Sequence, residues 1–109
     1  MEISFKNNKL EKSFTNDNLL SKTYGPMAKK VKQRYEDLKL ADNLFVISQY
    51  SAMRLHPYKG NKGIWSVDIN KNWRILFTIN QDHIPTFEGG GVNLRAIEII
   101  KIESVEDPH

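Results

Sequence analysis

The chain has 109 residues, no cysteine and a formal net charge of +3. This length predicts one domain, residues 1–109, with a core that needs no disulfide. The absence of cysteine excludes thiolate catalysis and sulfur-bound zinc. The first residues lack the apolar segment of a signal peptide, and no apolar run is long enough to span a bilayer. We therefore expect a soluble, cytoplasmic protein that does not enter a membrane.

The positive charges gather in the middle of the chain. Five cations occur from Lys22 to Arg34, with no acid in this stretch until Glu36. Five more occur from Arg54 to Arg74, with Asp68 as the single acid among them. A basic centre of this kind fits a surface that binds a polyanion such as RNA. A solvated helix face and solvated loops are the simpler explanation of the same charges.

The N-terminal half has mainly helical signals. Ile3 and Phe5 alternate with polar residues, which predicts an edge strand, whereas residues 7–24 indicate only short helical turns. A helix then begins at Gly25-Pro26, because proline is tolerated in a first turn. Its apolar residues recur at helical spacing: Met27, Val31, Tyr35 and Leu38. Asp42 or Asn43 caps a second helix through about Gln49, and the two helices are expected to form a hairpin.

The period changes to two after residue 50. It predicts strands over Ile64–Asn70 and Trp73–Asn80, joined by a tight turn at residues 70–72. Residues 81–93 include three consecutive glycines and are expected to form a flexible loop. Leu94–Ile102 is the most apolar segment and is predicted to be a central strand. The predicted fold is therefore α+β, with an N-terminal strand and a helical hairpin packed on an antiparallel β-sheet.

Two segments carry residues suited to phosphate chemistry. His56 and Lys59 lie three residues apart in a loop bounded by proline and glycine, and Asp107 and His109 lie at the end of the chain. An imidazole that titrates near neutral pH, beside a fixed positive charge, can move a proton while the charge stabilises a phosphate. If the residues beside Arg74 face the helices, Arg74 faces the bare side of the sheet. We expect these segments to meet on that open face.

Each of these residues also has a simpler interpretation. A loop histidine is usually a surface residue, a terminal Asp-Pro-His can be a frayed tail, and Arg74 can be a solvated strand residue. His83 is interpreted as a surface residue. Trp65 and Trp73 lie at period-two positions and are interpreted as core residues before they are considered as platforms for RNA bases. The combination of these residues, rather than any one of them, favours a nucleic-acid function.

That combination resembles the HigB branch of the RelE/ParE toxin superfamily, the toxins of bacterial toxin–antitoxin pairs. The resemblance covers most of the chain and is clearest from residue 33 to residue 109. It rests on these segments: Arg34-Tyr35-Glu36-Asp37-Leu38, Ala41-Asp42-Asn43-Leu44, Leu55-His56-Pro57-Tyr58-Lys59-Gly60, Gly63-Ile64-Trp65-Ser66-Val67, Trp73-Arg74-Ile75-Leu76-Phe77 and Asp107-Pro108-His109. The Leu-His-Pro-x-Lys-Gly element followed by Trp-Ser is the most specific of them.

The resemblance implies a ribosome-dependent endoribonuclease that cuts mRNA without a metal or other cofactor. By matching motif, His56 and Lys59 are the loop members of the active site, Arg74 is its strand arginine, and Asp107 and His109 are its C-terminal members. Lys59 and Arg74 would stabilise phosphate charge, and the two histidines would transfer protons in an order that the sequence leaves open. Asp107 would orient an imidazole.

The resemblance also implies partners, and the chain departs from the family pattern at two places. The expected partners are a HigA-like helix-turn-helix antitoxin, the ribosome and mRNA. The residues expected to bind RNA are Arg54, Lys62, Lys29, Lys30 and Lys32, although the lysines before residue 34 fit an acidic antitoxin segment equally well. Pro108 replaces a typical tyrosine, which removes an aromatic ring that could stack on a base. Residues 81–93 are longer than the expected hairpin.

Two other functions stay open at this stage. One is a non-enzymatic toxin of the ParE type, which shares the fold but inhibits DNA gyrase. Chains of that type generally lack the His/Lys/Asp/His set, which disfavours this alternative. The other is a decayed toxin that only binds its antitoxin, an alternative that Pro108 keeps open.

Overall fold

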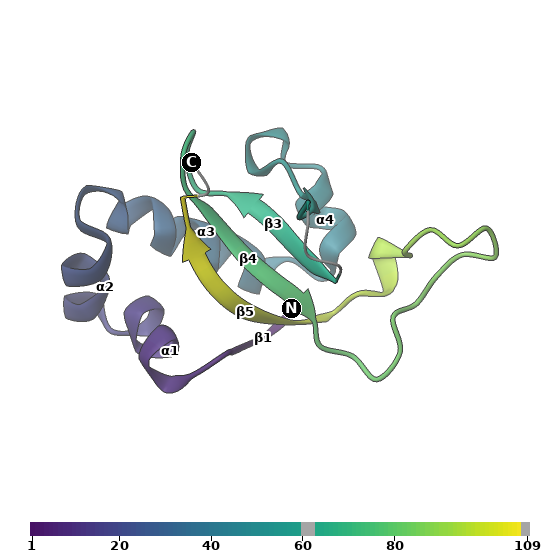
Figure 1. Cartoon of the computed structure of the whole chain (residues 1–109), viewed down its shortest axis with the longest axis horizontal. Helices are drawn as coiled ribbons and strands as arrows, with labels where there is room; N and C mark the ends of the chain where they lie inside the picture. The colour runs from purple at the N-terminus through teal and green to yellow at the C-terminus, as the bar shows by residue number, and fades with distance from the viewer. Residues whose placement is uncertain (60–62, 108–109) are drawn as a thin grey trace.

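A five-stranded mixed sheet with helices against one face forms the body of the molecule in the computed structural model, which describes residues 1–59 and 63–107 (Figure 1). The elements, in chain order, are β1 (Glu2–Phe5), α1 (Asn8–Thr15), α2 (Asp17–Tyr24), the 3-10 turn η1 (Gly25–Met27), α3 (Ala28–Leu40), α4 (Leu44–Ser48), the 3-10 turn η2 (Ser51–Met53), β2 (His56–Pro57), β3 (Ile64–Asp68), β4 (Arg74–Ile79), the 3-10 turn η3 (Leu94–Ala96) and β5 (Ile99–Glu106). The predicted α+β class is confirmed.

The strand order is β1-β5-β4-β3-β2. Strands β2 to β5 pair antiparallel with their neighbours, whereas β1 pairs parallel with β5. The predicted meander of the last three long strands is therefore present, and the predicted edge strand at Ile3 and Phe5 lies at one edge of the sheet. Among the described residues, no helix is long and apolar enough to cross a bilayer.

Asparagine side chains decide where three of the helices begin. The Oδ1 atoms of Asn7, Asn16 and Asn43 accept hydrogen bonds from the backbone three residues later, at 2.8, 3.1 and 3.2 Å. These N-caps satisfy amide groups that a helix start otherwise leaves unpaired. Asn43 caps α4 as the sequence predicted. Residues 7–24, for which only short helical turns were expected, form two complete helices because each of them begins at such a cap.

The core lies between the helices and one face of the sheet. Val31 and Leu38 of α3 are fully buried against the strands. The rings of Phe5, Phe14 and Tyr35 pack together with centroids 5.4 to 5.7 Å apart, which joins β1, α1 and α3. Because this cluster and the strand residues share one face, the other face of the sheet has no helical layer and is called the bare face, although Ser66 and Leu76 on it are buried.

The alternation of β3 and β4 sorts their residues between the two faces. Val67 and Ile75 are fully buried on the helical side and lie opposite each other. Asp68 and Arg74, also opposite each other, therefore lie on the other face. The predicted turn between these strands is confirmed, since Asn70 Oδ1 accepts hydrogen bonds from the backbone amides of Asn72 at 2.9 Å and Trp73 at 2.8 Å.

The last strand differs from the prediction in position. It runs over Ile99–Glu106 rather than Leu94–Ile102, and residues 94–96 form a 3-10 turn. The side chain of Gln81 binds the backbone at Ala96, Glu98 and Ile99, which holds the chain at the entrance of the strand. Strand β5 lies between β1 and β4, and β4 is the middle strand. A bulge beside Leu76 and Phe77 shifts the pairing.

Residues 81–93 leave the sheet as a long excursion that projects from the body of the molecule (Figure 1). Thr86 and Val92 form an isolated bridge across it, and Phe87 N donates to Gly91 O at 2.7 Å. Gly90 has a φ of 96°, a backbone conformation that favours glycine at this tip. The predicted loop therefore contains a small hairpin of its own.

Candidate functional site

A carboxylate between two arginines forms the centre of the bare sheet face. Asp68 Oδ2 accepts a hydrogen bond from Arg54 Nε at 2.8 Å, and Asp68 Oδ1 lies 3.6 Å from Arg74 Nε. The backbone carbonyl of Asp68 accepts a further bond from Arg34 Nε at 2.9 Å. The side chain of Asp68 is only 15% exposed. The Asp68 carboxylate raises the pKa of Arg54 above its usual value, first through the hydrogen bond and then through its charge.

Arg74 begins β4 and lies at the same end of the sheet as the end of β5. It is opposite Asp68 in one neighbouring strand and opposite Glu106 in the other. Its side chain is 14% exposed, and its Nη1 atom is buried without a hydrogen-bond partner among the described residues. A buried guanidinium nitrogen with an unused donor is energetically unfavourable, so Arg74 has hydrogen-bonding capacity that no described side chain satisfies.

His56 lies in the short edge strand β2, opposite Ser66 of β3. Its Nδ1 atom is 2.6 Å from the carbonyl oxygen of Arg54. A carbonyl only accepts hydrogen bonds, so Nδ1 carries the hydrogen and the Nε2 atom of the neutral ring carries the lone pair. Arg54 has a left-handed backbone, with φ 45° and ψ 52°, and this conformation presents its carbonyl to the ring. Nε2 is the atom that can take a proton.

Lys59 lies two residues beyond β2 and is exposed. The connection that contains it joins β2 to the start of β3, whereas Asp68 ends β3. The sheet register places the Cα atoms of His56 and Arg74 about 12 Å apart, two strands and two residues from each other. His56 and Arg74 therefore share one face of the sheet and are separated across it, whereas Lys59 lies outside the paired strands.

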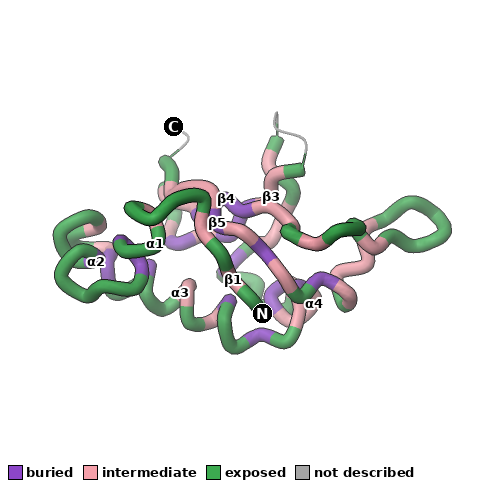
Figure 2. Tube along the Cα trace, turned by 90° about the horizontal axis from the view of Figure 1, so that it is seen from below, coloured by how far each residue is buried: buried purple, intermediate pink, exposed green. Residues whose placement is uncertain are grey.

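The C-terminal members are only partly described. Asp107 follows directly after β5, and the preceding residue pairs with Arg74, so Asp107 lies at the Arg74 end of the sheet. His109 and Lys62 lie outside the described residues. In Figure 2, the end of the described chain and the β2–β3 connection both rise on the side of the sheet away from α3 and α4. Segments far apart in sequence thus reach the same side.

The residues expected to bind RNA divide into two groups. Arg54 belongs to the Asp68 cluster on the bare face. Lys29, Lys30 and Lys32 lie on α3, across the sheet from that face (Figure 2). All three lysines are exposed, and Lys32 forms an ion pair with Asp17 at 3.1 Å. The α3 lysines therefore cannot share one contact with Arg54.

Two residues of the bare face were not predicted as site residues. Asp68 links Arg54 to Arg74, and Ser66 is fully buried with an Oγ atom that has no partner among the described residues. The alternation already indicated both residues, because Asp68 and Ser66 are two positions apart in β3 and so lie on one face of the sheet. Asp68 is opposite Arg74, and Ser66 is opposite His56. Asp68 was also the single acid in the second basic stretch.

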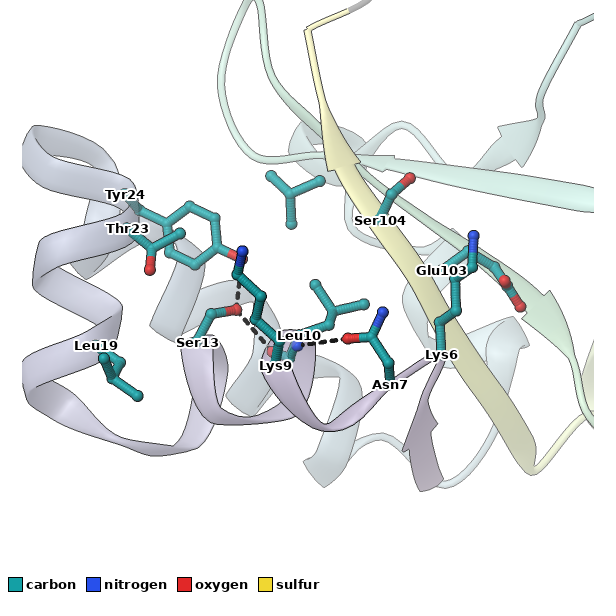
Figure 3. Close-up of a pocket in the computed structure, with 11 residues that line it drawn as sticks. Lys6, Asn7, Lys9, Leu10, Ser13, Leu19, Thr23, Tyr24, Glu103 and Ser104 are labelled. Carbon is teal, nitrogen blue, oxygen red and sulfur yellow. Dashed lines mark hydrogen bonds between the residues drawn. The ribbon is translucent and has the colours of Figure 1, made fainter.

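A surface groove of about 440 Å³ lies between the α1–α2 pair and β5 (Figure 3). Lys6 and Lys9 lie along it, and the Tyr24 hydroxyl donates to Ser13 Oγ at 2.8 Å, because Ser13 donates its own hydrogen to Leu10 O. Burial raises the pKa of Tyr24, so its phenol stays neutral. Of the predicted catalytic residues, the four that the structure describes do not line this groove.

A metal centre has no obvious position in this arrangement. Within residues 1–59 and 63–107, no three histidine, aspartate or glutamate side chains are grouped so that they could hold an ion. Asp68 is engaged by two guanidinium groups, which compete with any cation for its oxygens.

The fold and the basic bare face define an α+β domain of the RelE-like kind. The sequence model described as the RelE-like toxin of the type II toxin–antitoxin system HigB matches residues 3–87. The match spans most of the chain, and the chain belongs to this family of type II toxins. Membership implies an antitoxin partner. The match ends before β5, so it does not include Asp107 or His109. A search of curated proteins found no match.

Proposed function

We propose that this toxin is an endoribonuclease that cuts mRNA on the ribosome without a metal ion. One observation carries the proposal. The bare face of the sheet holds an imidazole with its Nε2 lone pair available, and a buried arginine with an unused donor. A proton acceptor and a phosphate-binding cation on one surface are what transesterification of RNA requires. Family membership supports the same activity.

In the proposed reaction, Nε2 of His56 takes the proton of a ribose 2′-hydroxyl. The 2′-oxygen attacks the adjacent phosphorus and forms an O2′–P bond. Arg74 and Lys59 stabilise the charge that grows on the phosphoryl oxygens. The P–O5′ bond breaks as an acid protonates the leaving oxygen, a role that this proposal gives to His109 because His56 acts as the base. The products are a 2′,3′-cyclic phosphate and a 5′-hydroxyl, so no water or metal is consumed.

The lysines of α3 serve a different contact in this proposal. They lie on the far side of the sheet from His56 and Arg74, so they cannot bind the scissile phosphate. We assign Lys29, Lys30 and Lys32 to ribosomal RNA, with the mRNA on the bare face beside Arg54. A HigA-like antitoxin is the proposed partner that keeps the toxin silent in the cytoplasm.

The function is tested by inducing the toxin without its antitoxin and mapping the ends of cellular transcripts. We expect growth arrest and new ends within translated regions. His56→Ala and Lys59→Ala should each abolish both effects, whereas His83→Ala, which changes a histidine in the 81–93 excursion, should leave them intact. Full toxicity of the first two variants would refute the site. DNA damage with intact transcripts would indicate gyrase inhibition, and harmless expression would indicate a protein that only binds its antitoxin.

A further inference from the structure

Asp68 contacts both arginines of the bare face, Arg54 and Arg74. Its two carboxylate oxygens face Arg54 and Arg74, with N–O separations of 2.8 and 3.6 Å. Without that carboxylate, two guanidinium groups would approach each other with no charge between them, and like charges at this range repel. The carboxylate therefore allows two arginines to lie on one small surface.

Arg54 connects Asp68 to His56. The side chain of Arg54 binds Asp68, and its backbone carbonyl accepts the hydrogen bond of His56 Nδ1. The left-handed conformation of Arg54 is unfavourable for a residue with a side chain, so a tertiary contact must hold it. The bond at 2.8 Å to Asp68 is one such contact, beside the bond from Arg54 N to Ser51 O at 3.2 Å. Arg54 therefore connects the Asp68 carboxylate to the His56 ring, and its carbonyl determines which ring nitrogen carries the hydrogen.

We propose that Asp68 is the positioning residue of this site, a role that rests on the proposed nuclease function. It orients the Arg74 guanidinium through the ion pair between Asp68 Oδ1 and Arg74 Nε at 3.6 Å, and it holds the Arg54 backbone whose carbonyl accepts the hydrogen bond of His56 Nδ1. Asp68 itself touches neither the ribose nor the reacting phosphorus. Asp68 therefore acts on the position of Arg74 and on the proton of His56, and it does not set the affinity for the substrate.

The same contacts allow another role for Asp68, which would have the opposite effect on RNA cleavage. If the carboxylate merely occupies the place of a phosphate, it competes with the substrate for Arg54 and Arg74. Removing its charge would then raise cleavage. The proposal predicts a fall instead, because an amide oxygen is a weaker acceptor for guanidinium and no longer balances two positive charges.

The test compares full-length Asp68→Asn with Asp82→Asn, which removes the same charge from an exposed loop. Single-turnover cleavage of ribosome-bound mRNA should show kcat lowered about 10-fold or more in Asp68→Asn with KM little changed, since positioning acts on the transition state. Asp82→Asn should match the parent chain. Equal or faster cleavage by Asp68→Asn would overturn the proposal.

A second measurement keeps the proposal separate from the nuclease assignment. Nitrogen NMR of the imidazole rings, assigned with a His56→Gln variant, reports which ring nitrogen carries the hydrogen. We expect a single Nδ1–H tautomer for His56 in the parent chain and in Asp82→Asn, and a mixture in Asp68→Asn and Asp68→Ala. An unchanged tautomer in both Asp68 variants would overturn the proposal. Because this readout needs no cleavage, a chain that cuts no RNA would refute the proposed function and still report on Asp68.

Discussion

Arg74 lies directly opposite Glu106 in the pairing of β4 with β5, so the chain that leaves β5 at Asp107 does so beside the start of β4. A strand arginine near the middle of the sequence is thereby brought to the same end of the sheet as the C-terminal segment. Ser104 Oγ donates to the Glu106 carboxylate at 2.6 Å, which occupies that acid within its own strand. The sheet register, rather than proximity in sequence, builds the candidate site.

The geometry of Arg74 predicts that its charge alone is insufficient. Arg74→Lys keeps the charge but replaces a planar group of several fixed donors with a single ammonium. We expect transcript cleavage to fall by about 100-fold, the range seen when one preorganised charge-stabilising donor is removed. Lys71→Arg, in the β3–β4 turn, is the matched control and should cleave normally. Normal cleavage by Arg74→Lys would mean that a point charge is enough at this position.

The helical layer predicts a contrast between two leucines of α3. Leu38 is fully buried and Leu40 is 83% exposed, although they are two residues apart in one helix. Leu38→Ala should lower the free energy of unfolding by about 2–5 kcal/mol, because it leaves a cavity against the sheet. Leu40→Ala should change it by less than about 0.5 kcal/mol. Urea denaturation of both variants measures the difference, and equal losses would contradict the observed orientation of α3.

The sequence predicted the strands far better than the first two helices. The strands have period-two patterns that burial on one face imposes, and Val67 and Ile75 are buried as that pattern requires. In residues 7–24, Phe14 and Leu20 are the main apolar contacts with the core, too few for a helical stripe. The caps at Asn7 and Asn16 define these helices, and a cap is recognised only once the helix after it is known.

Sequence reasoning nominated members of the candidate site but not the contacts between them. Alternation placed Arg74 on the bare face, and the spacing of His56 and Lys59 suggested phosphate chemistry. Alternation gives Asp68 a place on this face, but its pairing with Arg54 and Arg74 also depends on the left-handed turn at Arg54 and on the register of three strands. Long-range pairing of this kind arises only from the tertiary fold.

The position of α3 predicts a separate role for its lysines. Replacing Lys29, Lys30 and Lys32 with alanine should weaken ribosome binding and make its salt dependence shallower, because fewer counterions are released when fewer phosphates are contacted. Lys9, Lys12 and Lys22 replaced together form a control of equal charge on α1 and α2. Ribosome sedimentation across a salt series measures both. Equal losses in the two triple variants would indicate a general charge effect and no specific α3 contact.

The chemical nature of the RNA ends produced by the purified toxin on ribosome-bound mRNA tests the central claim most directly. Attack by the ribose hydroxyl predicts a 2′,3′-cyclic phosphate on one fragment and a 5′-hydroxyl on the other, formed equally well with a chelator present. His56→Gln should form neither end. Fragments with a 5′-phosphate, or cleavage that stops when divalent ions are removed from a folded toxin and an intact ribosome, would contradict the account.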